Sequence, residues 1–178
     1  MASVERTAYP RFKRVVSARE LAEFFTPSLE ETAWERSRTR SPEGLLALAL
    51  WLKSCQRLGY FAALATVPAA VVDHVRARLG LGTEVMPSAG VRAGENYRTW
   101  IRECLGLVRD PARAREIAVA ATEAAAPVKA HSADLVNVAL EEIVRAGLEL
   151  PGFSTLDRMA ASVRARVEGR SARGSCPG

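Results

Sequence analysis

The residues best suited to chemistry lie near the end of the sequence, where hydroxyl and guanidinium groups open an expected helix over residues 154–168. Ser154 and Thr155 stand at its start, and Arg158 follows one turn later. We expect Ser154 to cap this helix, with Asp157 completing a capping box. Hydroxyl and guanidinium groups hydrogen-bond to base edges and to phosphates, so the expected chemistry is recognition of DNA.

This helix belongs to a helix-turn-helix pattern. Residues 132–146 repeat apolar side chains at helical spacing, and residues 147–153 form a short turn that contains proline and glycine. In a helix-turn-helix, the second helix enters the major groove by its N-terminal end. That geometry places the first turn of the last helix at base edges, and it places Arg164 and Arg166 at phosphates.

Helix start signals recur along the rest of the chain. A serine followed three residues later by glutamate is a capping box, and a proline at the first helical position needs no amide partner. No stretch alternates apolar and polar residues as a half-buried strand would. The sequence therefore predicts an all-α protein. The expected helix starts are Ser17, Ser28, Ser41, Pro68 and Asp110.

Glycine and proline divide the chain into two small helical, helix-turn-helix-like modules. Residues 1–80 hold a basic arm and the first module, and residues 81–96 are rich in glycine, with few periodic apolar residues, as in a linker. Residues 97–168 form the second module. We expect residues 169–178 to be a disordered tail of atypical sequence. The 48% hydrophobic content is sufficient for helical cores.

The basic residues suggest a nucleic-acid partner. The net charge is +5, and only three of the 25 basic residues are lysines. Arginine suits phosphate and guanine edges, although a solvated charged face is the usual explanation for such residues. Positive charge at a helix start is unfavourable unless an anion is near, which favours phosphate contact before Ser41. The further candidate DNA contacts are Arg11, Lys13, Arg14, Arg36, Arg38, Arg40, Lys53, Arg57, Arg98 and Arg102.

Other classes of function find little support. The aspartates are scattered over several helices, and three widely spaced cysteines with two histidines form no zinc pattern. We therefore expect no catalytic residue, metal or cofactor. No apolar run approaches the roughly 18 residues of a membrane helix, and the N-terminus lacks the apolar core of a signal peptide. The expected location is the bacterial cytoplasm, in association with the nucleoid.

Several segments carry a resemblance to a known family. The chain resembles, over roughly residues 5–168, the N-terminal region of the large replicative transposases of the Tn-three family. The last two segments are the most specific. The segments are Leu21-Ala-Glu-Phe-Phe25, Leu58-Gly-Tyr-Phe61, Asn96-Tyr-Arg-Thr-Trp-Ile-Arg-Glu-Cys-Leu-Gly106, Asp134-Leu-Val-Asn-Val-Ala-Leu-Glu-Glu-Ile-Val-Arg145 and Leu150-Pro-Gly-Phe-Ser-Thr-Leu-Asp-Arg158.

The resemblance implies binding to double-stranded DNA at the terminal inverted repeats of a transposon. In that family, strand cleavage and transfer belong to a ribonuclease-H-like domain with three metal-binding carboxylates, far downstream. The sequence departs from the family pattern after about Glu168, so we expect a chain truncated before that domain and not itself an enzyme. A related hypothesis is that it associates with full-length transposase, or competes with it for the ends. The alternatives are a helical protein-interaction module and a non-functional transposase remnant.

Overall fold

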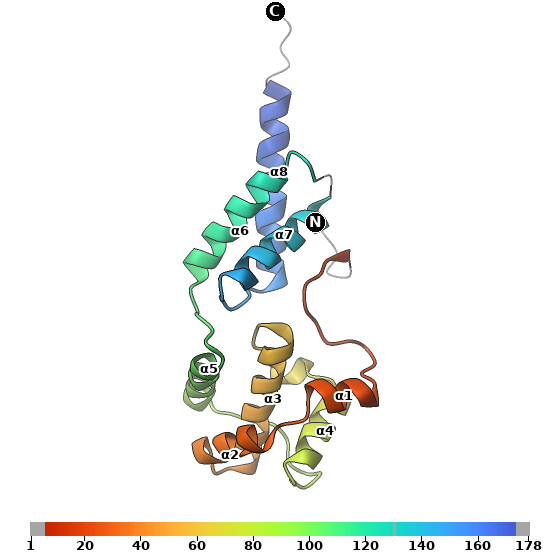
Figure 1. Ribbon diagram of the computed structural model, residues 1–178, viewed down its shortest axis with the longest axis vertical. Coiled ribbons are helices and arrows are strands. Elements are labelled where there is room, and N and C mark those ends of the chain that lie inside the picture. The colour runs from red at the N-terminus through yellow and green to blue at the C-terminus, as the bar shows by residue number, and fades with distance from the viewer. Residues whose placement is uncertain (1–5, 130, 174–178) are drawn as a thin grey trace, which may run out of the picture. The chain divides into compact units, whose positions relative to one another are not determined.

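The computed structural model describes residues 6–129 and 131–173, and its regular structure over these ranges is helical (Figure 1). The described part contains no strand, only an isolated parallel bridge between Val108 and Leu148. The all-α prediction is confirmed. The chain forms two compact units, Pro10–Gly106, and Leu107–Gly178 together with Met1–Tyr9. We call them the central unit and the terminal unit.

The first three helices of the central unit start where the capping signals predicted. Ser17 and Ser28 each form a complete capping box, with Glu20 and Glu31 respectively. The Ser41 hydroxyl accepts a hydrogen bond from the Gly44 amide at 3.0 Å. The helices are α1 (Ala18–Phe24), α2 (Leu29–Arg38), α3 (Pro42–Leu58), α4 (Ala69–Arg78) and α5 (Val91–Leu105), with a short 3₁₀ helix, η2 (Leu64–Thr66).

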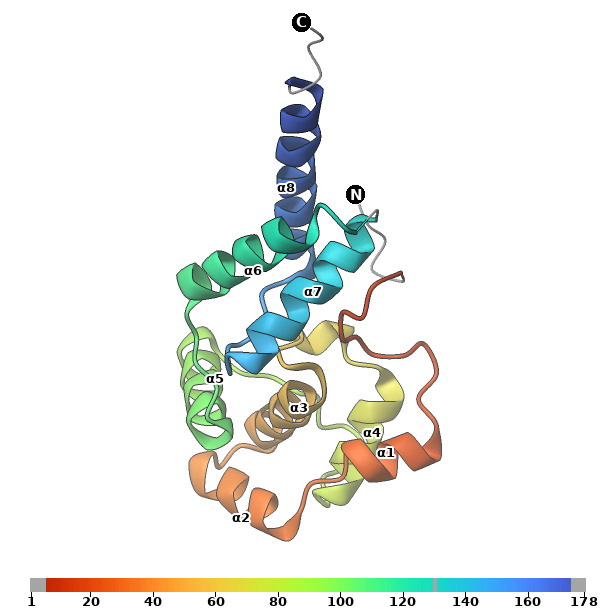
Figure 2. The same cartoon turned by 45° about the horizontal axis from the view of Figure 1, so that its top comes forward.

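Helix α3 forms the core of the central unit. Every residue from Gly44 to Cys55 is buried, which is the behaviour of a helix that is apolar on most of its faces. It packs against α2, α4 and α5 (Figure 2). Val71 and Val75 of α4 are fully buried in the same core. The α3 helix therefore fixes the positions of the surrounding helices and of the charged side chains that they carry.

The terminal unit is a three-helix assembly of α6 (Pro111–Ala125), α7 (Ser132–Arg145) and α8 (Phe153–Arg173). Each helix packs against the other two (Figure 1). Asp110 caps α6 as predicted, because its carboxylate accepts a hydrogen bond from the Arg113 amide at 2.8 Å. The buried faces of α7 and α8 include Leu135 and Leu156.

The start of the chain completes the terminal unit. The Ala8 amide donates a hydrogen bond to the Asn137 side-chain oxygen on α7 at 2.7 Å. The Tyr9 hydroxyl donates to the Pro151 carbonyl oxygen at 3.1 Å, and its ring meets the Phe153 ring edge-on at a centroid distance of 5.6 Å. Tyr9 is buried, so this short segment holds the turn between α7 and α8.

The structure divides the chain differently from the expected modules. Helix α5 begins at Val91, inside the expected linker of residues 81–96, and the whole helix belongs to the central unit. Gly94 explains the difference: it is buried, and an added Cβ would lie 3.2 Å from the Trp51 ring. A glycine that suggested a loop in the sequence is therefore a helix-packing contact.

The last helix also differs from its prediction. The Thr155 and Leu156 amides donate to the Gly152 carbonyl, so α8 starts at Phe153. Ser154 consequently lies inside the first turn and does not cap the helix. Helix α8 continues to Arg173, through half of the expected disordered tail, and the remaining tail residues lie outside the described ranges.

The close approach at Gly94 gives a testable expectation. We expect Gly94→Val to destabilise the central unit by roughly 1–3 kcal/mol, because two methyl groups must fit where a single Cβ already crowds Trp51. Urea unfolding followed by tryptophan fluorescence measures this change. Gly90→Val is the control, since an added Cβ at Gly90 meets nothing within 4 Å. Equal stability of the two variants would contradict the expectation.

Candidate nucleic-acid interface

The terminal unit has a groove between α6 and α8 with a volume of about 460 Å³. Its polar lining consists of three arginines and two hydroxyl residues. Because these side chains are all donors of hydrogen bonds, and three carry positive charge, the groove is suited to a polyanion. The polar residues are Arg115, Thr155, Arg158, Ser162 and Arg166.

Four of these residues lie along one face of α8. Residues 155, 158, 162 and 166 are spaced by three or four, so the helix presents them as a single stripe. The Arg158 Nε donates to the Ser154 carbonyl oxygen at 3.1 Å, which turns its guanidinium back along the helix. Arg166 lies 3.0 Å from a Glu123 carboxylate oxygen in a half-exposed ion pair, which contributes little stability and leaves the arginine accessible.

Sequence reasoning missed Arg115. It lies in α6 within an alternation of alanine and arginine that resembles an ordinary solvated face. Arg115 and Val119 are four residues apart, which places them on the same face of a helix. This spacing was the only feature of the sequence that linked Arg115 to the groove, and it does not by itself predict a binding site. Conversely, the predicted contact Arg164 is half-buried and is not among the residues that line the groove.

The basic arm was expected over residues 1–16, and its part after Tyr9 lies against α1 and the end of α3 in the central unit. Arg11, Lys13 and Arg57 line a small hollow there, and the Arg57 guanidinium lies over the Phe24 ring at 4.3 Å. Arg14 is exposed. The arm is therefore positioned by contacts within the unit, although its cations remain largely accessible.

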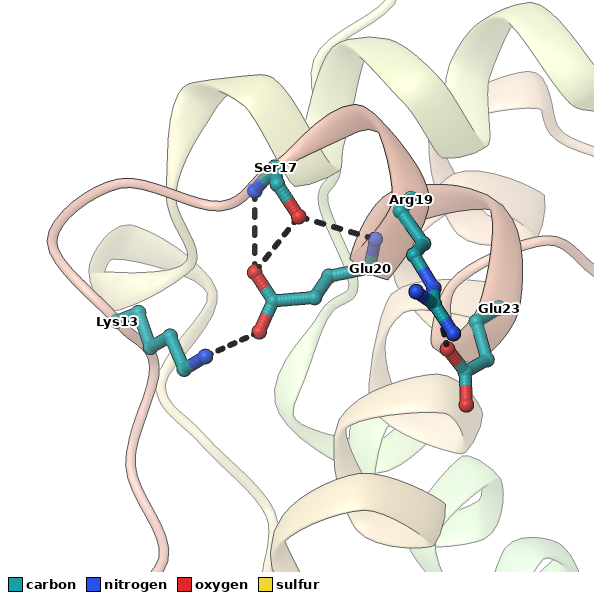
Figure 3. A network of polar contacts seen from close by, with 5 residues as sticks. All are labelled: Lys13, Ser17, Arg19, Glu20 and Glu23. Atoms are coloured by element: carbon teal, nitrogen blue, oxygen red, sulfur yellow. Dashed lines mark hydrogen bonds and ion pairs between the residues drawn. The ribbon is translucent and has the colours of Figure 1, made fainter.

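Glu20 attaches the arm to α1 (Figure 3). Its carboxylate pairs with the Lys13 ammonium and accepts hydrogen bonds from the amide and hydroxyl of Ser17 at 3.1 and 2.9 Å. The bond from Lys13 and those from Ser17 lower the pKa of Glu20 to about 2. Lys13 is therefore part of an ion pair, and a phosphate would have to compete with Glu20 for it.

The three arginines in the last turn of α2 and just after it have different environments. The Arg36 guanidinium donates to the Leu79 carbonyl oxygen at 2.8 Å, so it binds the end of α4. Arg38 lies over two rings, at 5.8 Å from Trp34 and 5.1 Å from Trp100. Arg40 is exposed. These residues were predicted as one phosphate-binding run, and the structure assigns an internal role to Arg36.

Lys53, another of the predicted contacts, is buried. Its side chain is 9% exposed and its ammonium lies 2.6 Å from the Glu31 carboxylate. Lys53 and Arg57 are four residues apart on α3, and this spacing alone does not show that Lys53 is buried while Arg57 is exposed. The partner that buries Lys53, Glu31, comes from α2 and could not be inferred from the spacing.

Arg98 and Arg102 of α5 both lie over aromatic rings of the central unit. The Arg98 guanidinium is 5.1 Å from the Trp51 ring centroid, and that of Arg102 is 4.9 Å from the Phe61 centroid. Both arginines are half-buried. Sequence reasoning selected these residues without identifying the rings beneath them.

The described residues offer neither a metal site nor a membrane span. Within them, no three histidine, cysteine, aspartate or glutamate side chains gather in a way that could hold a metal ion. In the same part of the chain, no helix combines the length and apolar character needed to cross a membrane.

Comparison with known proteins gave one family match. The model of the family described as "Domain of unknown function (DUF4158)" matches residues 1–163. No curated protein matches the chain significantly.

Proposed function

The chain belongs to the DUF4158 family, a domain of unknown function, and we propose that this member binds double-stranded DNA as the end-recognition segment of a replicative transposase. The sequence resemblance to Tn-three-family transposases spans roughly residues 5–168, nearly the same part of the chain as the family match. Its target would be the terminal inverted repeats of a transposon, and its role would be binding rather than strand cleavage. In the same proposal, full-length transposase is an associate or a competitor at these ends.

The observation that carries the proposal is the α6–α8 groove. Three guanidinium groups and two hydroxyls converge there from two helices, without an acidic residue among those that line it. In the proposed complex, α7 and α8 act as a helix-turn-helix, and the first turn of α8 approaches base edges. Thr155 and Arg158 would contact bases, and Arg115 and Arg166 would contact phosphates.

The first experiment compares two duplexes. Fluorescence anisotropy would measure the affinity of the chain for the inverted repeat that flanks its gene, and for a scrambled duplex of the same composition, over a series of salt concentrations. Preference for the repeat at physiological salt supports the proposal. Equal affinity for both, lost as salt rises, would leave only non-specific attraction between a basic protein and DNA.

Variants of the groove give a sharper prediction. We expect Arg115→Gln/Arg158→Gln to weaken binding to the inverted repeat by about 10-fold or more, since two phosphate or base contacts are lost. The control is Arg109→Gln/Arg113→Gln, which removes the same charge from exposed positions of the terminal unit that do not line the groove. A similar loss in both double variants would show that net charge, not the groove, governs binding.

A further inference from the structure

Two of the α5 arginines, Arg98 and Arg102, form a second basic feature, separate from the α6–α8 groove. Arg98 and Arg102 are four residues apart, so they lie on the same face of α5, and each has its guanidinium over a different ring. We call this pair with its two rings the α5 arginine ladder. The ladder lies wholly within the central unit.

The Trp51 ring of the ladder is held by packing. Trp51 is 7% exposed, and its Nε1 donates a hydrogen bond to the Ala62 carbonyl oxygen at 2.9 Å. Gly94 lets α5 approach this ring closely, with an ideal Cβ position 3.2 Å from it. The Trp51 ring beneath Arg98 is therefore held in one position by its packing.

A guanidinium over a ring is favourable for binding an anion. The ring attracts the cation and restricts its side chain, while the N–H donors project from the edge of the guanidinium plane and can still reach a ligand. Less conformational entropy is then lost when an anion binds. The ladder presents two such cations one helical turn apart.

The position of the side chains indicates which part of DNA they would meet. Both guanidinium groups lie over rings of neighbouring segments, and this stacking favours a position against the protein surface over one extended into a groove. They can contact an anionic surface that lies across the helix. In duplex DNA that surface is the sugar-phosphate backbone, which carries no sequence information.

We propose that the α5 arginine ladder is a sequence-independent contact to the phosphate backbone of duplex DNA. This inference rests on the proposed DNA binding, and it assigns a different contribution to binding to each of the two units. The central unit contributes affinity through Arg98 and Arg102, and the α6–α8 groove of the terminal unit contributes preference for one sequence.

The test uses the full chain, the inverted-repeat duplex and the scrambled duplex in a salt series. Arg98→Gln/Arg102→Gln should weaken binding to both duplexes by the same factor, roughly 10- to 30-fold at physiological salt, and should lower the salt slope by about two. The matched control is Arg78→Gln/Arg92→Gln, which removes the same charge from exposed positions of the same unit. It should change the affinity less than about 3-fold.

A second variant distinguishes the effect of the positive charges from that of the ring beneath Arg102. Phe61→Leu removes the ring beneath Arg102 and keeps both cations, so it should weaken binding a few-fold to both duplexes without altering the salt slope. Circular dichroism shows whether each variant remains folded. A folded Phe61→Leu protein with unchanged affinity would contradict the role of the ring.

The remaining outcomes distinguish the two proposals. If the wild-type chain prefers the inverted repeat but the ladder variant binds as tightly as the wild type, the ladder proposal fails and the proposed function stands. If the ladder variant loses affinity only for the inverted repeat, the ladder recognises sequence, and the proposal that it is a sequence-independent contact is wrong. If the wild-type chain binds neither duplex, the proposed function itself fails.

Discussion

Replacing Glu35 by glutamine is expected to stabilise the central unit by roughly 4 kcal/mol above about pH 8, the largest gain in stability that we predict for a single substitution. Glu35 of α2 is fully buried, and neither carboxyl oxygen has a hydrogen-bond partner in the described structure. Burial, followed by the nearby Glu31 carboxylate, raises the pKa of Glu35 from 4.5 to about 8, against the opposing charges of Lys53 and Arg36.

The direction of this pH dependence follows from the protons that Glu35 binds in the folded and unfolded chain. Between about pH 4.5 and pH 8 the folded chain keeps the Glu35 proton while the unfolded chain loses it. The contribution of Glu35 to the free energy of unfolding therefore falls as pH rises through this window, and this contribution is highest below it. Glutamine resembles the protonated acid and does not titrate, so the variant should lose this part of the pH dependence.

Urea unfolding at several pH values between about 5 and 9 would measure the effect. All three tryptophans lie in the central unit, so tryptophan fluorescence reports on that unit alone. Glu30→Gln is the control, because Glu30 is an exposed residue of the same helix. The interpretation is wrong if Glu35→Gln and wild type show the same change of stability with pH.

The largest loss of stability is expected in the terminal unit for Tyr9→Ala, at roughly 3 kcal/mol or more. The substitution removes a buried ring from its contact with Phe153 and removes the hydroxyl that donates to the Pro151 carbonyl. Because these contacts hold the turn before α8, affinity for the inverted repeat should fall as well. Far-UV circular dichroism follows the unfolding of both units, and tryptophan fluorescence follows only the central one.

Tyr9→Phe separates the two contributions of this residue. It keeps the ring and loses only the hydroxyl, so the expected loss is about 1 kcal/mol. In Tyr9→Ala, the circular dichroism transition should move to lower urea while the fluorescence transition stays in place. A shift of the fluorescence transition alone would mean that Tyr9 stabilises the central unit instead.

Local signals explain which parts of the fold were predictable. The starts of α1, α2, α3 and α6 depend on a capping side chain three residues from its partner amide, which a sequence displays directly. The apolar run of α3 likewise predicts a buried helix. These features are determined within one or two helical turns, and the structure confirms them.

Long-range packing explains what the sequence did not reveal. Whether Lys53 faces solvent depends on Glu31 in another helix, and whether Gly94 is a loop or a packing residue depends on Trp51. The candidate groove has the same limitation, because Arg115 joins the α8 residues only when α6 packs beside them. The charge-based choice of candidate residues therefore included some residues that line the groove and missed the arginine contributed by α6.

The participation of residues before Pro10 in the terminal unit has a consequence for the design of shortened proteins. The polypeptide passes between the two units twice, once after Tyr9 and once after Gly106, so neither a single cleavage nor a single stop codon separates them cleanly. A protein that begins at residue 107 lacks the tyrosine that supports the turn before α8. An amino-terminal deletion intended to remove the charges of the basic arm would also remove that support, and a loss of the proposed DNA binding in such a protein would be mistaken for an electrostatic effect.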